Sequence, residues 1–158
     1  VTFADEVTVA SSTLKLNGLG VRRAYGMFEV YIAGLYVPET SQDPAKILEM
    51  SGPKQIVMHF KRFVDKGKLS EAWENGFRNN ASKEYTYRPE LNRLVSLMSN
   101  MKTDEKIVLS FFSNKAEVTV KDKPMETFES ADFSKTLLQV FIGNPPDQDL
   151  KNGLLGLK

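Results

Sequence analysis

The stretch from Leu16 to Val37, LNGLGVRRAYGMFEVYIAGLYV, contains the pattern that decides the fold. From Met27 onward it is rich in aromatic and β-branched residues, which predicts a buried strand. Its first part continues a strand in which apolar and polar side chains alternate from Leu14 onward. The glycines of Asn17-Gly18-Leu19-Gly20 predict a bulge or bend in that strand. The segment therefore predicts two strands, the first of them irregular.

Working outward, the rest of the chain contains further strands and helices in blocks. Strands are predicted over 7–9, 54–61, 107–112, 117–120 and 125–128, and helices over 44–50, 69–77, 89–98, 130–142 and 149–155. Strands come first, helices occupy the middle, more strands follow and a helix closes the chain. This order predicts an α+β fold with a largely antiparallel sheet and helices segregated to one side. A doubly wound parallel sheet is disfavoured because no regular βαβ alternation is visible.

Length and composition limit the possible classes of protein. The chain has 158 residues, which suits one domain, residues 1–158, with a single core. It has 21 Lys and Arg against 20 Asp and Glu, and this balance argues against a nucleic-acid partner. No cysteine and one histidine are present, which excludes thiolate chemistry and histidine-rich metal sites. We therefore expect neither a metal nor a cofactor.

The sequence itself does not decide between an exported and a cytoplasmic protein. No apolar run approaches the roughly 18 residues that cross a membrane, so we expect no integral membrane segment. The first residue is Val1 rather than Met, which fits an exported protein after signal-peptide removal and a trimmed cytoplasmic chain alike. The lack of cysteine is compatible with both.

Arg22 and Arg23 are the most informative polar residues. Adjacent residues of a strand point to opposite faces, so one arginine could face the layer beneath the sheet. An inward arginine needs a carboxylate from the protein or from a ligand, and Tyr31 on the adjacent strand could add a hydrogen bond. Periodicity alone favours the alternative, in which both arginines are exposed at a sheet edge.

Two other motifs have structural interpretations. Gly18-x-Gly20 lacks the third glycine of a dinucleotide-binding loop, because position 23 is arginine. His59 lies in the middle of a predicted strand without a carboxylate or nucleophile nearby in sequence, so a structural role is favoured over that of a general base. The many aromatic residues are expected to form the core, and some of them to line an apolar cavity between sheet and helices.

The segment from Leu16 to Val37 resembles the signature of the chalcone isomerase-like superfamily, and it is most similar to the bacterial members. The resemblance continues through Gly52–Lys54, Leu69–Phe77, Ser130–Pro146 and Asp149–Gly156. It implies the chalcone isomerase fold, an open-faced sandwich in which a large antiparallel sheet packs against a layer of helices with a ligand cleft between. Because bacterial members usually have a signal peptide, it also implies a periplasmic or secreted protein.

The superfamily contains flavonoid isomerases and noncatalytic fatty-acid-binding proteins. In the isomerases, the Arg of a G-x-R motif, matched by Arg22, activates the substrate phenolate. The positions of the Thr, Tyr, Asn and late Ser or Thr that complete that site match Tyr31, Leu69, Gly76 or Asn75, and Ser134. Because Tyr31 replaces the Thr and Leu69 lacks a hydroxyl, the resemblance implies that efficient chalcone cyclisation is lost and that no residue is catalytic.

In the fatty-acid-binding members, the matching Arg and a Tyr in a K-V-Y-A-like motif hold the ligand carboxylate. Here that motif is Glu29-Val30-Tyr31-Ile32, so Arg22 and Tyr31 are retained and Glu29 stands where relatives often have Lys. Period-two alternation places Glu29 and Tyr31 on one strand face. If Glu29 reaches Arg22, a charged ligand has to compete with it.

The leading hypothesis is a noncatalytic, exported binding protein for a small amphipathic ligand, foremost a fatty acid. Its expected ligand-binding residues are Arg22, Tyr31, Glu29, Leu69, Trp73 and Ser134. One alternative is an isomerase or lyase of the chalcone isomerase type, with Arg22 as electrophilic anchor and Tyr31 as general acid for a small phenolic substrate. Another is a structural or envelope-interaction protein whose cleft is filled by its own side chains, such as Phe28, Met58 and Trp73.

Overall fold

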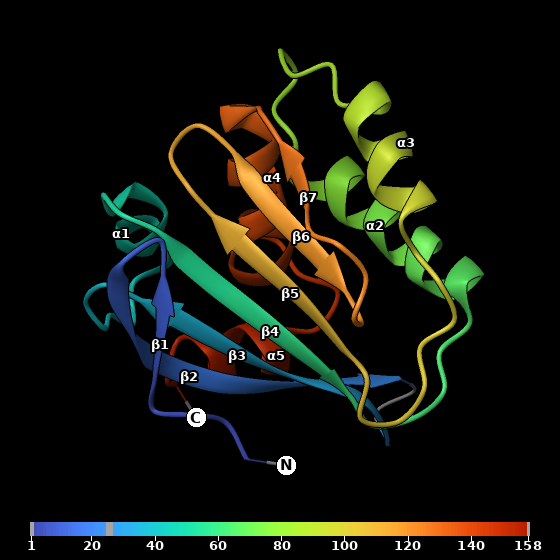
Figure 1. The fold of residues 1–158 in the computed structure, drawn as a ribbon, viewed down its shortest axis with the longest axis horizontal. Helices are drawn as coiled ribbons and strands as arrows, with labels where there is room; N and C mark the ends of the chain where they lie inside the picture. The colour runs from blue at the N-terminus through green and yellow to red at the C-terminus, as the bar shows by residue number, and fades with distance from the viewer. Residues whose placement is uncertain (1, 25–26, 158) are drawn as a thin grey trace.

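Seven strands form one antiparallel sheet in the computed structural model, which describes residues 2–24 and 27–157 (Figure 1). Each strand pairs with the next one along the chain, so the sheet order is the sequence order. The strands are β1 (Glu6–Val9), β2 (Ser12–Ala24), β3 (Phe28–Val37), β4 (Lys54–Phe60), β5 (Lys106–Phe111), β6 (Ala116–Val120) and β7 (Glu126–Phe128). The predicted antiparallel sheet is confirmed.

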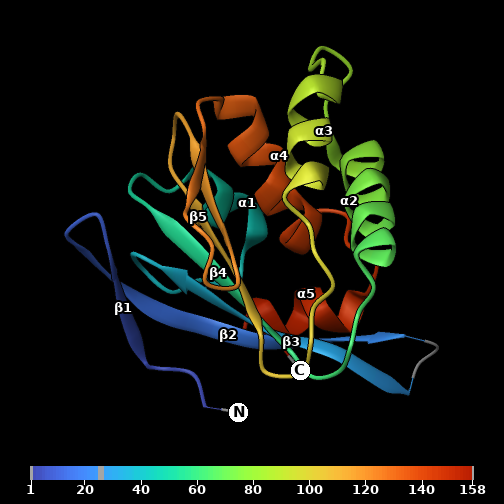
Figure 2. The ribbon, with the colours of Figure 1, turned by 45° about the vertical axis from the view of Figure 1, so that its right-hand side comes forward.

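Helices cover one face of this curved sheet (Figure 2). They are α1 (Pro44–Glu49), α2 (Lys66–Asn80), α3 (Arg88–Ser96), α4 (Ala131–Ile142) and α5 (Gln148–Leu154). Four begin at an Asp or Ser whose side chain accepts a backbone N–H of the first turn: Asp43, Asp65, Ser130 and Asp147. Together with the antiparallel sheet, these helices confirm the predicted α+β class.

Within the described residues, no helix combines the length and apolar character required to span a membrane.

The core lies between the helices and the inner face of the sheet. Strand β4 shows the alternation that builds it, since Ile56, Met58 and Phe60 are buried against the helices. His59 points to the opposite face, where its Nε2 lies 2.9 Å from Oδ1 of Asp104. This position fits the structural interpretation of the histidine.

Strand β2 is longer than the sequence pattern predicts, because it continues without a break through the glycine-containing segment. Its register against β3 shifts between Leu16 and Gly18, which confirms the expected bulge. The bulged residue is Asn17, whose side-chain amide donates to the carbonyl oxygens of Ser41 (3.0 Å) and Leu154 (2.8 Å). The bulge thus ties β2 to the end of α5.

Helix α5 packs directly on the backbone of β2, and three glycines make this approach possible. A Cβ at Gly18 would collide with the carbonyl oxygen of Gly153, and one at Gly20 with the carbonyl oxygen of Leu150. A Cβ at Gly153 would in turn meet the carbonyl oxygen of Leu19 and lie 2.6 Å from Cα of Gly20. Glycine at these positions is required for close contact between two backbones.

The substitution Gly153→Ala is expected to destabilise the protein although alanine is the better helix former. The new Cβ meets backbone that no rotamer change can move, and overpacking of this kind costs about 1–3 kcal/mol. That exceeds the gain of about 1 kcal/mol in helix propensity. Urea unfolding should show the loss, whereas Gln148→Ala, at an exposed position of the same helix, should change stability by less than about 0.5 kcal/mol. Equal stability of wild type and Gly153→Ala would contradict the close backbone contact.

Candidate functional site

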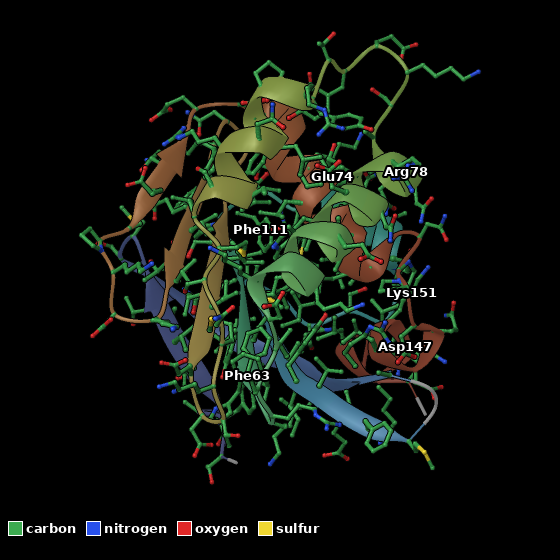
Figure 3. All side chains as sticks on the ribbon, turned by 90° about the vertical axis from the view of Figure 1, so that its right-hand side faces the viewer. Phe63, Glu74, Arg78, Phe111, Asp147 and Lys151 are labelled. Carbon is green, nitrogen blue, oxygen red and sulfur yellow. The ribbon has the colours of Figure 1, made fainter. Side chains whose placement is uncertain are left out.

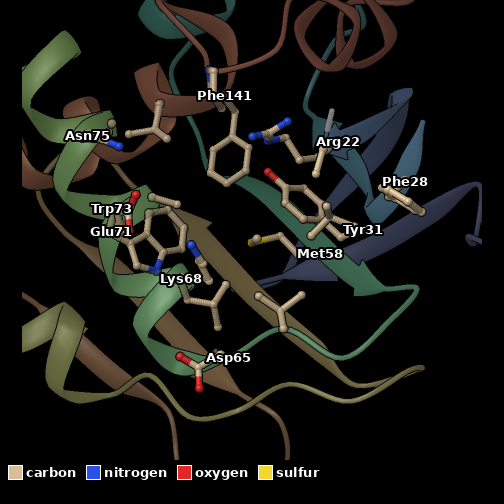
Figure 4. Close-up of a pocket in the computed structure, with 18 of the residues that line it drawn as sticks. Arg22, Phe28, Tyr31, Met58, Asp65, Lys68, Glu71, Trp73, Asn75 and Phe141 are labelled. Carbon is tan, nitrogen blue, oxygen red and sulfur yellow. The ribbon is translucent and has the colours of Figure 1, made fainter. Parts of the chain in front are cut away.

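A pocket of about 620 Å³ opens between α2, the β2–β3 pair and the C-terminal end of α4 (Figure 4). This volume lies within the range of about 300–1,000 Å³ that is typical of small-molecule sites. The buried part of its wall consists mainly of apolar residues: Tyr31, Met58, Leu69, Trp73, Gly76, Val140 and Phe141. Phe28, Met58 and Trp73 line this space and do not fill it, which argues against a cleft closed by its own side chains.

Four of the six residues expected from the sequence line this pocket: Arg22, Tyr31, Leu69 and Trp73. Ser134 does not, because its side chain is turned to the sheet, where its Oγ donates to the carbonyl oxygen of Phe112 at 2.8 Å. Glu29 also lies outside the pocket lining. Helix α2 also presents polar residues at the pocket, among them Lys68, Glu71 and Asn75. Of these, only Asn75 was considered as a site residue from the sequence, as a possible match for the isomerase Asn position, and none was predicted to bind the ligand. Their spacing of three and four residues along one helix face was the signal that could have found them.

A second bulge explains why Glu29 does not share a face with Tyr31. Arg22 pairs with Tyr31 but Arg23 pairs with Glu29, so Val30 is the additional residue on β3. The bulge interrupts period-two alternation, and the expectation that Glu29 and Tyr31 lie on one face is wrong. Glu29 instead lies 3.7 Å from the Arg23 guanidinium, and both side chains are partly exposed.

Arg22 faces the pocket, so the interpretation of both arginines as exposed edge residues is wrong for Arg22. Its nearest carboxylate belongs to Asp147, with 3.8 Å between Nη1 and Oδ2. That separation is too long for a hydrogen bond. The Asp147 carboxylate instead accepts the backbone N–H groups of Arg23 (3.1 Å) and Asp149 (2.9 Å).

The Arg22 guanidinium has five N–H groups, and Nη1 donates to the carbonyl oxygen of Arg23. Its side chain is 30% exposed. Among the hydrogen bonds of the described residues, none joins this guanidinium to a carboxylate. Arg22 is therefore a cation on a mainly apolar wall that keeps donors for an incoming anion.

Tyr31 stands next to Arg22, and Figure 4 shows its hydroxyl on the same side of the pocket as the guanidinium. Burial raises the pKa of this phenol far above its ordinary value; the nearby Arg22 charge lowers it in part, and Asp147 raises it further. The side chain therefore stays protonated at neutral pH. Tyr31 lines the pocket, and among the hydrogen bonds between described residues none involves its hydroxyl. Tyr31 thus offers a neutral donor beside the cation.

The opposite wall is held rigidly by contacts between α2 and its neighbours. The Trp73 indole N–H donates to the sulfur of Met98 at 3.1 Å, and its ring meets Phe141 edge-on at a centroid distance of 6.1 Å. Gly76 lets α2 approach α4, because a Cβ there would lie 2.8 Å from the Val140 side chain. The buried part of this wall is therefore apolar, and its indole donor is already satisfied.

The segment after α4 is fixed to the end of α2 by one amide side chain. Asn80 accepts the N–H of Asn144 through Oδ1 at 2.8 Å and donates to its carbonyl oxygen through Nδ2 at 2.9 Å. This pairing positions the chain that leads from Asn144 to Asp147, and with it the carboxylate beside Arg22.

Among the described residues, no cluster of histidine and carboxylate side chains could hold a metal ion.

These features define a class of α+β protein in which a curved antiparallel sheet and a helical layer enclose an apolar pocket with one arginine and one tyrosine on its wall. The sequence profile of the chalcone isomerase-like family matches residues 1–156, and the chain belongs to that family. No curated protein matched the sequence. Among solved structures, it is similar to a fatty-acid binding protein of Arabidopsis thaliana, AtFAP1, with a TM-score of 0.74 and 14% sequence identity. The alignment covers 98% of this chain and 91% of that protein, and it shows a shared fold.

The protonated phenols predict a loss of stability at alkaline pH. The pKa values of Tyr31, Tyr36 and Tyr85 are all raised, with burial as the largest cause. Above about pH 10 the unfolded chain therefore releases phenol protons that the folded chain retains, so the free energy of unfolding falls as pH rises. Replacing Tyr31 with Phe should reduce this fall, as measured by urea unfolding at a series of alkaline pH values. Identical pH dependence in wild type and Tyr31→Phe would show that the phenol is not buried.

Proposed function

We propose that the protein binds a fatty acid or a closely related amphipathic carboxylate in the pocket without catalysing a reaction. The observation that supports this most directly is Arg22, a partly buried cation on an apolar wall that lacks a hydrogen-bonded carboxylate. A ligand carboxylate would accept two parallel N–H groups from the guanidinium. Tyr31 would donate a further hydrogen bond from the adjacent strand.

The remainder of the pocket suits an alkyl chain. Met58, Leu69, Trp73 and Phe141 present carbon-rich surfaces, and burial of each CH₂ group contributes about 0.8 kcal/mol. A hydrogen bond to a charged group contributes about 1.5–3 kcal/mol. The tail of a long-chain ligand therefore supplies most of the affinity, while Arg22 selects ligands with an anionic head.

The groups on the wall favour binding over isomerisation. The position at which the isomerases have a hydroxyl is occupied by Leu69, which is buried and apolar. The raised pKa of Tyr31 prevents the phenol from accepting a proton at neutral pH, and an arginine does not act as a base. Proton transfer would have to rely on exposed groups at the pocket entrance.

The structural likeness to a fatty-acid binding protein agrees with this proposal. Because the two sequences are 14% identical, that likeness establishes the shared fold, and the argument for the ligand rests on the groups in the pocket.

We further propose that the protein acts in the periplasm or outside the cell, on the basis of its resemblance to exported bacterial members of the family. Fractionation of the source cells, followed by immunoblotting with a cytoplasmic marker in parallel, tests this location. Recovery with the cytoplasmic marker would overturn the proposed location.

The matched pair Arg22→Ala and Arg23→Ala tests the binding site. The two arginines are adjacent in sequence, but Arg22 lines the pocket and Arg23 pairs with Glu29 outside it. Displacement of a fluorescent fatty acid should show about 10- to 100-fold weaker binding for Arg22→Ala, because charge-assisted hydrogen bonds are lost. Arg23→Ala should bind like the wild type.

Two outcomes would contradict the proposal. Lipid extraction and mass spectrometry that find no bound fatty acid, together with no displacement of the probe, would exclude fatty-acid binding. Turnover of a chalcone by the wild type, abolished in Arg22→Ala, would support the isomerase alternative instead.

A further inference from the structure

The pocket entrance exposes large apolar side chains at the tips of two chain segments. Met27 and Phe28 lie where β3 begins and are 70% and 45% exposed, and Phe63 lies in the segment before α2 and is 57% exposed. Phe28 and Phe63 also line the pocket, so its apolar wall continues to the outer surface. Figure 3 shows Phe63 on the face that is turned toward the viewer, below α2. Exposed apolar groups that are continuous with a cavity indicate a binding surface.

Basic residues flank Phe63 along the chain. The segment from residue 61 to 71 contains Lys61, Arg62, Lys66 and Lys68 against Asp65 and Glu71. The Asp65 carboxylate caps α2 by accepting the N–H of Gly67 at 2.8 Å. The Arg62 guanidinium lies 4.7 Å from the centroid of the Phe28 ring, so a cation and an aromatic ring from the two segments meet at the entrance.

We propose that this entrance patch, defined as Met27, Phe28, Phe63, Arg62, Lys66 and Lys68, docks on the surface of an anionic phospholipid bilayer. Aromatic and apolar side chains enter the interface between head groups and acyl chains, while basic side chains attract anionic head groups. Docking in this orientation directs the open pocket at the lipid. The bilayer would then be the place from which the protein takes its ligand or to which it delivers it. Only the identity of that ligand rests on the proposed function.

Vesicle co-sedimentation of the protein without added fatty acid tests the docking. Vesicles of phosphatidylcholine with an equimolar share of phosphatidylglycerol are compared with vesicles of phosphatidylcholine only. The wild type is expected to bind the anionic vesicles at least about tenfold more tightly, and salt should weaken this binding. The double variants Met27→Ser/Phe63→Ser and Arg62→Glu/Lys66→Glu should each weaken it by about tenfold or more.

Two controls lie away from the entrance. Leu19 is an exposed apolar residue on the face of β2 opposite α5, and Lys83 lies beyond the other end of α2. Leu19→Ser and Lys83→Glu are expected to bind anionic vesicles like the wild type. Thermal unfolding of every variant confirms that the fold is retained.

Absence of wild-type binding to anionic vesicles would overturn the docking, as would equal losses in the entrance and control variants. Binding of the patch to an acidic protein with no affinity for vesicles would overturn it in favour of a protein partner. Fatty-acid affinity is measured separately in solution without vesicles. A failure of the proposed function and a failure of the docking therefore appear in different measurements.

Discussion

The contact between the backbones of α5 and β2 determines both the fold at this end of the molecule and the geometry of the site. Gly18, Gly20 and Gly153 allow the helix to rest on the strand with no side chain between them. Arg22 follows Gly20 by two residues on the same strand face, and Asp147 is the N-cap of the same helix. The glycine contact therefore brings the carboxylate to the arginine. If side chains separated the helix from the strand, the N-terminus of α5 would lie farther from β2 and Arg22 would lose its neighbouring negative charge.

The placement of that carboxylate balances two opposing requirements. A cation on an apolar wall is unfavourable without a nearby negative charge, yet a direct bidentate ion pair would occupy the donors that a ligand needs. Asp147 lies 3.8 Å from the guanidinium, and its oxygens are engaged by two backbone N–H groups. It can therefore stabilise the charge through space without using the donors. This arrangement favours an arginine that is held in position but remains available, and ligand binding would stabilise the folded protein further by mass action.

Much of the architecture was predictable because it follows local patterns. The alternation in β4 and the glycine bulge in β2 are read from neighbouring residues. The family signature around Arg22 and Tyr31 also pointed to residues that line the pocket. The neighbour of Arg22 was not predictable, because Asp147 is more than a hundred positions away and is placed by packing of α5. The bulge at Val30, which turns Glu29 outward, has no sequence signal such as glycine, so simple periodicity gave the wrong face.

The distribution of titratable groups indicates what the pocket can do chemically. Among the described residues that line it, Arg22 and Tyr31 lie on the β2–β3 wall, whereas Arg62, Asp65, Lys68 and Glu71 are exposed at the entrance. General acid–base catalysis needs a group whose pKa lies near the working pH and which is within reach of the reacting atom. Arginine and a buried phenol with a raised pKa remain protonated, so the inner wall offers hydrogen-bond donors and positive charge but no proton acceptor. An anionic group at this wall would be held by charge-assisted hydrogen bonds from the Arg22 guanidinium and the Tyr31 hydroxyl.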